Sequence, residues 1–197
     1  MQRKSMLDLV VALALCWLTQ AAAMAAVEVG GVNFADKAKV GESELALNGA
    51  GMRAKFFLKV YAMGLYVPEK KSSAADLIYG KGARRMHIVT LRDLSAEDFA
   101  KALVDGIHKN FDDKDFVALK ARTEALQQTI LSLKAAPKGA QIYLDWLPAS
   151  GTRLSFNGEK RGDDLPGEDF YQALLRIWLG DYPAAQDLKE ALLGKTQ

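Results

Sequence analysis

Arg53 and Tyr61 are the two polar residues that we single out as a pair able to hold a carboxylate. A guanidinium presents a rigid fork of N–H donors to both carboxylate oxygens, and a phenol adds one hydrogen bond. Such a charged hydrogen bond is worth on the order of 1.5 to 3 kcal/mol, whereas each buried methylene of an acyl chain adds ~0.8 kcal/mol. A fatty acid bound there would owe most of its affinity to its tail and its orientation to the polar pair.

The spacing of the pair sets a geometric condition. Residues 55–67 are rich in aromatic and β-branched types and predict a long strand, and Asn48-Gly49 predicts the hairpin turn before it. Eight residues on a straight strand span ~26 Å, so Arg53 and Tyr61 can meet only if the chain turns sharply between them. The plain alternative is an exposed arginine at a strand edge and a half-buried structural tyrosine.

The two faces of the predicted strand differ in composition. Alternation puts Phe56, Leu58, Val60, Ala62, Gly64 and Tyr66 on one face, and Lys55, Phe57, Lys59, Tyr61, Met63 and Leu65 on the other. We interpret the first face as core. The second mixes large apolar groups with cations and a phenol, and we predict that it forms the wall of a cleft for an amphipathic anion.

Other motifs give no support for cofactor, metal or nucleophilic chemistry. Residues 49–54 match G-x-G-x-x-A, but a strand follows where a dinucleotide site needs a helix, so the glycines indicate a tight turn, a bulge or a close backbone approach. His87 and His108 are the only histidines, and no carboxylate cluster lies near them with ligand spacing. We expect neither a cofactor nor a metal, and interpret Asp112-Asp113 and Asp163-Asp164 as solvated loop acids.

The N-terminus has the pattern of a secretory signal. A basic start is followed by an apolar run, 9–18, and by small residues, 21–25. We predict cleavage near Ala25 and a secreted, periplasmic protein with no membrane anchor afterwards; the alternative is an uncleaved anchor, but the apolar run is shorter than the ~20 residues that span a bilayer. The only cysteine, Cys16, lies in this segment, so the mature chain would have no disulfide.

The rest of the chain predicts one globular domain, residues 26–197. The whole chain of 197 residues is 50% hydrophobic and 25% charged, a globular composition, and its net charge of only +2 gives no reason to expect a nucleic-acid partner. The patterns predict strands around Gly30-Gly31, at 84–91, 142–147 and 152–156, and helices at 73–79, from 95, from 115, at 167–179 and from 183. Segregated strands and helices indicate an α+β fold with helices on one face of an antiparallel sheet.

Three stretches resemble the bacterial branch of the chalcone isomerase-like family: Leu47–Arg53, Lys59–Tyr66 and the tail from Pro166 to Gly194. Together they extend over nearly all of the mature chain. The resemblance implies an open-faced β-sandwich, in which helices cover one face of a large antiparallel sheet. It therefore agrees with the α+β fold predicted from the patterns alone.

The same resemblance implies roles for particular residues. The family contains enzymes that close a chalcone to a flavanone, non-catalytic relatives, and proteins that bind fatty acids in the equivalent cleft. Arg53 matches the arginine shared by the enzymes and the fatty-acid binders, and Tyr61 falls where the binders carry a tyrosine. Phe99, Gly106 and Ile177 stand where the enzymes place polar residues, which implies a more apolar cleft without the enzymes' electrostatic positioning.

We therefore expect a non-catalytic protein that binds a fatty acid or similar hydrophobic carboxylate, with Arg53, Tyr61, Phe99 and Ile177 as its site. Two alternatives stay open. One is an intramolecular lyase of chalcone isomerase type, with Arg53 as the electrostatic stabiliser. The other is a structural or partner-binding domain with a closed cleft, which an open apolar cleft reaching Arg53 would exclude.

Overall fold

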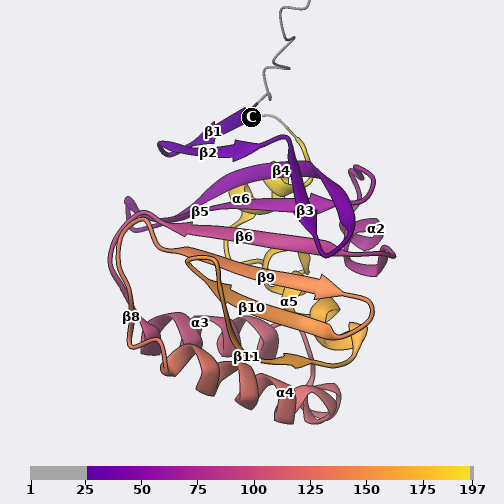
Figure 1. Cartoon of the computed structure of the whole chain (residues 1–197). Helices are drawn as coiled ribbons and strands as arrows, with labels where there is room; N and C mark the ends of the chain where they lie inside the picture. Colours follow the sequence, from indigo (N-terminus) through magenta and orange to yellow (C-terminus); the bar gives the residue numbers. More distant parts are fainter. Residues whose placement is uncertain (1–25, 196–197) are drawn as a thin grey trace, which may run out of the picture.

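A seven-stranded antiparallel sheet with the order β11-β10-β9-β6-β5-β4-β3 forms the centre of the fold (Figure 1). The computed structural model describes residues 26–195, so the predicted secretory signal, residues 1–25, lies outside the described residues. The strands of the sheet are β3 (Lys37–Val40), β4 (Ser43–Lys55), β5 (Leu58–Val67), β6 (Arg84–Thr90), β9 (Gln141–Leu147), β10 (Gly151–Phe156) and β11 (Glu159–Leu165). Two further pairs stand apart from it: β1 (Ala26–Val29) with β2 (Val32–Ala35), and β7 (Leu94–Ser95) with β8 (Ala135–Ala136).

The helices pack on one face of this sheet, as predicted. They are α2 (Ala74–Tyr79), α3 (Ala96–His108), α4 (Asp113–Leu131), α5 (Glu168–Leu179) and α6 (Gln186–Leu192). Figure 1 shows α5 and α6 behind the sheet, with α3 and α4 along its β11 end. The apolar stripes of α3, α4 and α5 are buried there together with the inward residues of β5, β6 and β9. This burial supplies most of the apolar stabilisation of the fold.

Short side chains fix where the two long helices begin. The Ser95 hydroxyl accepts a hydrogen bond from the Asp98 backbone N–H at 3.0 Å, which confirms the predicted start of a helix at this residue. Asp112 caps α4 in the same way, accepting from the backbone N–H of Asp115 at 2.8 Å. The helix therefore starts at Asp113 instead of the predicted Asp115. Asp112 is exposed and precedes the helix, as predicted for a solvated loop acid, and its carboxylate also satisfies a helix donor.

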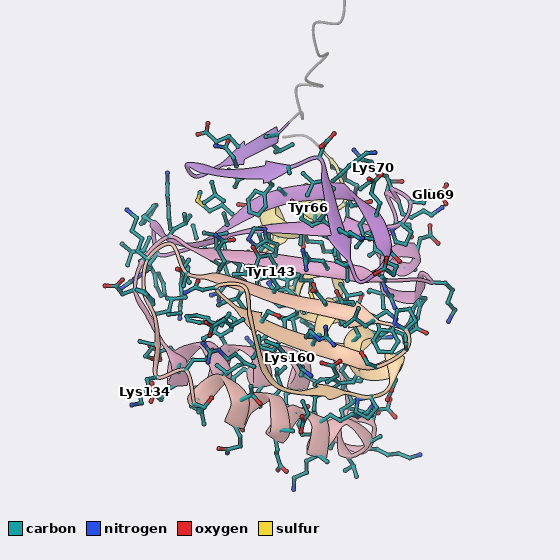
Figure 2. All side chains as sticks on the ribbon, in the orientation of Figure 1. Tyr66, Glu69, Lys70, Lys134, Tyr143 and Lys160 are labelled. Atoms are coloured by element: carbon teal, nitrogen blue, oxygen red, sulfur yellow. The ribbon has the colours of Figure 1, made fainter. Side chains whose placement is uncertain are left out.

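A second, smaller core covers the other face of β4 and β5. Phe34, from the β1–β2 ribbon, is fully buried there with Ala62 and Tyr66. Gly64 makes room for it, because a Cβ on Gly64 would lie 2.8 Å from Cδ1 of Phe34. In Figure 2, Tyr66 and Tyr143 lie over this side of the sheet, opposite the helices.

Both faces of β5 are therefore core, which corrects the predicted division into a core face and a cleft face. Tyr61, Met63 and Leu65 are buried toward the helices, and Ala62 and Tyr66 toward the ribbon. Only the first residues of the predicted strand depart from this pattern: Phe56 and Leu58, expected in the core, are exposed. The cleft is confined to that end of the strand.

The predicted turn at Asn48-Gly49 is wrong. β4 continues through these residues without a turn. The register of its pairing with β5 shifts between Leu47 and Gly49, so Asn48 forms a bulge in the strand. The buried Asn48 amide donates to the carbonyls of Lys71 (3.0 Å) and Leu192 (2.7 Å) and accepts from the Lys71 backbone N–H (2.7 Å). The Asn48 side chain therefore connects β4 to the segment at Lys71 and to the end of α6, although its local sequence is typical of a turn.

The glycines after Asn48 allow α6 to approach the backbone of β4. A Cβ on Gly49 would lie 2.1 Å from the carbonyl oxygen of Ala191, and one on Gly51 would lie 2.6 Å from the Ala191 Cβ. The interpretation of G-x-G as a close backbone approach is confirmed, and a helix supplies the approaching backbone.

Strand β11 was not predicted, because its sequence, Glu159–Leu165, is polar on both faces and lacks alternation. It pairs with β10 at the edge of the sheet. Arg153 of β10 donates through Nε (2.9 Å) and Nη2 (2.6 Å) to the Asp164 carboxylate, and these bonds hold the pKa of Asp164 well below its usual range. Asp164 is therefore an ion-paired strand residue and not a solvated loop acid.

Candidate functional site

Arg53 and Tyr61 lie directly opposite each other in the β4–β5 ladder. The chain turns between them at Phe56-Phe57, flanked by the paired residues Lys55 and Leu58. The Arg53 guanidinium carbon is 5.8 Å from the centroid of the Tyr61 ring. The sharp turn that the spacing demanded is present, and the two polar groups can reach one ligand.

Tyr61 is held by Trp178 of α5. The Trp178 indole Nε1–H donates to the Tyr61 hydroxyl oxygen at 2.7 Å, and both side chains are buried. Burial raises the pKa of Tyr61, although the Trp178 hydrogen bond and the Arg53 charge act in the opposite direction. The phenol therefore stays protonated at neutral pH. Because indole is a donor only, the hydroxyl hydrogen of Tyr61 is left for a ligand acceptor.

Arg53 has unused donors. Among residues 26–195 the structure gives its side chain no hydrogen bond and no ion pair, and its Nε is buried without a partner. Buried polar groups are nearly always satisfied, so an orphaned guanidinium nitrogen beside a hollow indicates a site for an acceptor. A carboxylate is the acceptor whose two oxygens fit the fork.

A cleft of about 550 Å³ lies beside this pair. Its wall includes all four predicted site residues, Arg53, Tyr61, Phe99 and Ile177, and Trp178 beside them. The side chains of Phe99, Ile177 and Trp178 are at most 7% exposed, so they form the packed floor of the cleft. The volume lies in the range of sites for small organic ligands, and an apolar floor together with charged groups in the lining suits an amphipathic molecule.

Gly106 is not on the cleft wall, which corrects the inference that it makes the cleft more apolar. It lies where α3 packs against α5: a Cβ there would be 2.7 Å from Cγ2 of Ile177. Glycine at this position lets the two helices approach closely. It contributes to the cleft only by setting the position of Ile177.

Charged side chains surround the mouth of the cleft. Of its three acids, Asp105 pairs with Lys101 at 2.6 Å, Asp93 accepts from the backbone N–H of Lys138 at 2.7 Å, and Asp98 lies in the first turn of α3. Lys55 and Arg92 also line the mouth, and no ion pair is found for either within the described part of the chain. Together with Arg53 they favour an anionic ligand at this end.

Trp178 is the site residue that sequence reasoning missed, because the helical pattern of residues 167–179 does not distinguish it from the core residues of that helix. A buried tryptophan needs an acceptor for its indole N–H, which is a usable signal. The sequence does not identify that acceptor, because Tyr61 lies 117 positions away.

His87 lies on the opposite face of the sheet from the cleft. Its ring contacts Phe34 edge-on and stacks on Tyr143. Burial, with a smaller effect of the Arg85 charge, lowers the pKa of His87 to about 4. It is therefore a neutral structural histidine.

Residues 26–195 contain no cluster of three or more histidine, cysteine, aspartate or glutamate side chains arranged to hold a metal ion. No helix within that range is long and apolar enough to cross a membrane.

Comparisons with known proteins connect this architecture to a family. The chalcone isomerase-like family profile matches residues 26–194. No curated protein sequence matches the chain. The crystal structure of a fatty-acid binding protein of Arabidopsis thaliana has a TM-score of 0.64 and 17% sequence identity, over 86% of this chain and 96% of that one. At this identity the likeness establishes the fold, and it confirms the predicted α+β architecture.

Proposed function

The chain belongs to the chalcone isomerase-like family, and from this membership we propose that it binds a fatty acid or a similar hydrophobic carboxylate without transforming it. The observation that carries the proposal is the convergence of Arg53 and Tyr61, each with an unused donor, at one end of an apolar cleft. A protein named for fatty-acid binding has the same fold, and this supports a fatty acid as the class of ligand.

The carboxylate would be held by the Arg53 fork and by the Tyr61 hydroxyl hydrogen. Trp178 fixes the direction of that hydrogen because its own N–H already occupies a lone pair of the Tyr61 oxygen. The acyl chain would lie against Phe99 and Ile177. Its methylenes supply most of the affinity, at ~0.8 kcal/mol for each one buried.

The arrangement gives little support to an isomerase. Phe99 and Ile177 offer no hydrogen bond to a reacting ketone, phenolate or water, so these two positions supply no polar group to stabilise developing charge. A purely structural domain with a closed cleft is also disfavoured, because the cleft reaches Arg53 and has a volume of about 550 Å³.

We also propose that residues 1–25 are removed as a secretory signal and that the protein acts in the periplasm. The support is the charge and hydropathy pattern of that segment. Intact-mass measurement on protein from fractionated cells tests both statements. An N-terminus retained at Met1 would overturn the first statement, and protein found only in the cytoplasmic fraction would overturn the second.

The ligand proposal is tested by native mass spectrometry of the protein purified from its own compartment, followed by extraction and identification of any bound acid. Arg53→Ala should lose the ligand, and Tyr61→Phe should retain it less well. Arg161→Ala is the matched control, because Arg161 lies on β11 and outside the cleft. A wild-type protein that is empty and takes up no added fatty acid would overturn the proposal.

A further inference from the structure

The turn between β4 and β5 carries a continuous exposed apolar tip, formed by Phe56, Phe57 and Leu58. Their exposures are 83%, 104% and 55%, so most of the surface of these three residues faces solvent. Figure 1 shows the β4–β5 connection projecting at one end of the sheet. Single exposed apolar residues are ordinary, but three consecutive ones on a projecting turn indicate a surface that something else covers.

The backbone of the tip is unfavourable for the residues it carries. Phe56 and Phe57 have φ angles of 48° and 66°. Positive φ at both central positions is the pattern of a type I′ hairpin turn, for which Asn-Gly is strongly preferred. Bulky residues rarely adopt this conformation. Two phenylalanines therefore occupy a strained turn, with little packing within residues 26–195 to offset the strain, and this favours a role outside the chain.

Basic residues frame the tip. Lys55 and Lys59 flank it, both are exposed, and neither has an ion pair within residues 26–195. Arg92 follows Leu91, whose backbone N–H donates to the Val60 carbonyl at 2.9 Å and so holds the next loop beside the tip. Aromatic groups at the end of a protrusion, with cations around its base, suit the interface of an anionic lipid surface. A protein interface fits less well, because lysine is depleted there.

We propose that this tip inserts into the surface of an anionic lipid bilayer, with Phe56, Phe57 and Leu58 in the interface and Lys55 and Lys59 at the headgroups. Phe56 and Leu58 also line the mouth of the cleft, so insertion would bring the cleft opening to the lipid. The inference goes beyond the proposed function and needs no assumption about what the cleft holds.

The test is flotation with vesicles of equimolar phosphatidylglycerol and phosphatidylcholine, compared with vesicles of phosphatidylcholine alone. All variants keep the same N-terminus, verified by mass, so that any contribution of residues 1–25 is common to them. Phe56→Asn/Phe57→Gly should weaken binding to the anionic vesicles by at least about tenfold, because two large aromatic groups no longer enter the interface. Val117→Ser/Tyr182→Ser, which removes exposed apolar groups elsewhere, should bind like wild type.

Two double variants test whether binding to anionic vesicles requires the lysines beside the tip. Lys55→Gln/Lys59→Gln should weaken anionic binding by roughly tenfold or more, since each lysine near such a surface contributes about 1 kcal/mol. Lys109→Gln/Lys114→Gln, exposed and far from the tip, should have little effect. Wild-type binding should be much weaker to phosphatidylcholine alone.

Two results would overturn the inference: equal vesicle binding by wild type and Phe56→Asn/Phe57→Gly, or no wild-type binding to anionic vesicles. In the second case, crosslinking from position 57 to a protein would assign the tip to a protein partner. Vesicle binding and binding of the acid can be tested separately. Phe57→Ser, a residue outside the cleft, should lose vesicle binding and keep its bound acid, while Arg53→Ala should lose the acid and keep vesicle binding.

Discussion

Arg53 of β4 faces Tyr61 of β5 across the hairpin ladder, with the guanidinium carbon 5.8 Å from the phenol ring. Both groups keep a donor that is unused within residues 26–195: Arg53 Nε has no hydrogen-bond partner there, and Tyr61 accepts from Trp178 while retaining its own hydrogen. The hairpin thus presents two directed donors at the end of an apolar cleft. Each of the following predictions tests a contact that builds this arrangement or the sheet behind it.

Arg53→Lys should weaken fatty-acid binding even though it keeps the positive charge. A lysine is a point charge and cannot reproduce the planar fork. The loss of one charged hydrogen bond, about 1.5 to 3 kcal/mol, corresponds to roughly a ten- to hundredfold rise in Kd. Isothermal titration with a saturated fatty acid measures it, and Arg161→Lys serves as the control. Equal affinity of Arg53→Lys and wild type would show that the fork is not used.

The Trp178–Tyr61 hydrogen bond can be isolated with a double-mutant cycle. Tyr61→Phe leaves the buried Trp178 N–H without an acceptor and should cost about 1 to 3 kcal/mol of unfolding free energy. Trp178→Phe should cost at least as much, because it also reduces the buried volume. Adding the second change to Tyr61→Phe should cost less than it does in wild type. Urea denaturation of all four proteins gives the coupling, and strictly additive costs would refute it.

Phe56→Asn/Phe57→Gly should stabilise the fold. The replacement supplies the residues that favour positive φ at both turn positions, where phenylalanine is strained. We expect a gain of about 1 to 3 kcal/mol, limited by the entropy of the added glycine. The urea midpoint should rise with an unchanged slope. A lower midpoint would mean that the phenylalanines support the hairpin.

Stability should fall between pH 6.5 and 4 through His87. Its pKa is about 4 in the folded protein and 6.5 ordinarily, so the unfolded chain takes up the proton first as the pH falls. The stabilisation is therefore complete above pH 6.5, declines toward pH 4, and changes little below that. Its size is roughly 1 to 3 kcal/mol. His87→Phe, which keeps the ring contacts, should flatten this part of the curve, and an identical pH profile would contradict the assignment.

Gly49→Ala should destabilise the protein by more than about 2 kcal/mol, because backbone has to move to relieve the contact. The added Cβ would meet the Ala191 carbonyl oxygen at 2.1 Å. Ala54→Ser, exposed on the same strand, is the control. Thermal denaturation gives the melting temperatures of both variants. If Gly49→Ala melts at the wild-type temperature, α6 can move away from β4 without cost and the prediction is wrong.

Elements specified by local chemistry were predictable. The strands around Gly30-Gly31, the helix start at Ser95 and the long helices that follow all depend on residues close in sequence, and the structure confirms them. The family resemblance was likewise carried by short motifs, and the match over residues 26–194 confirms it.

What failed depended on distant partners. Asn48 has the local appearance of a turn residue, but its bonds go to Lys71 and Leu192. The true turn carries two phenylalanines and no turn residue, so no local rule finds it. Strand β11 is polar and is held by the Arg153–Asp164 pair.

The residues of the site could be predicted from the sequence, but their arrangement could not. Arg53 and Tyr61 were identified from residue chemistry and resemblance, and the structure brings them together with Phe99 and Ile177 in one cleft. Their role in binding stays a prediction. The Trp178 contact could not be deduced, since it joins a strand to a helix far along the chain.

The bond from Asn48 to the Leu192 carbonyl spans 144 positions and has a consequence for the order of folding. Until the last helix is made, Asn48 lacks one of its acceptors, and Gly49 and Gly51 have no backbone to pack against. Contacts of such long range are slow to form, because the intervening chain must first be ordered. A nascent chain would therefore remain incompletely folded until its C-terminus is released, and a chain shortened before α6 should be a ready substrate for proteases.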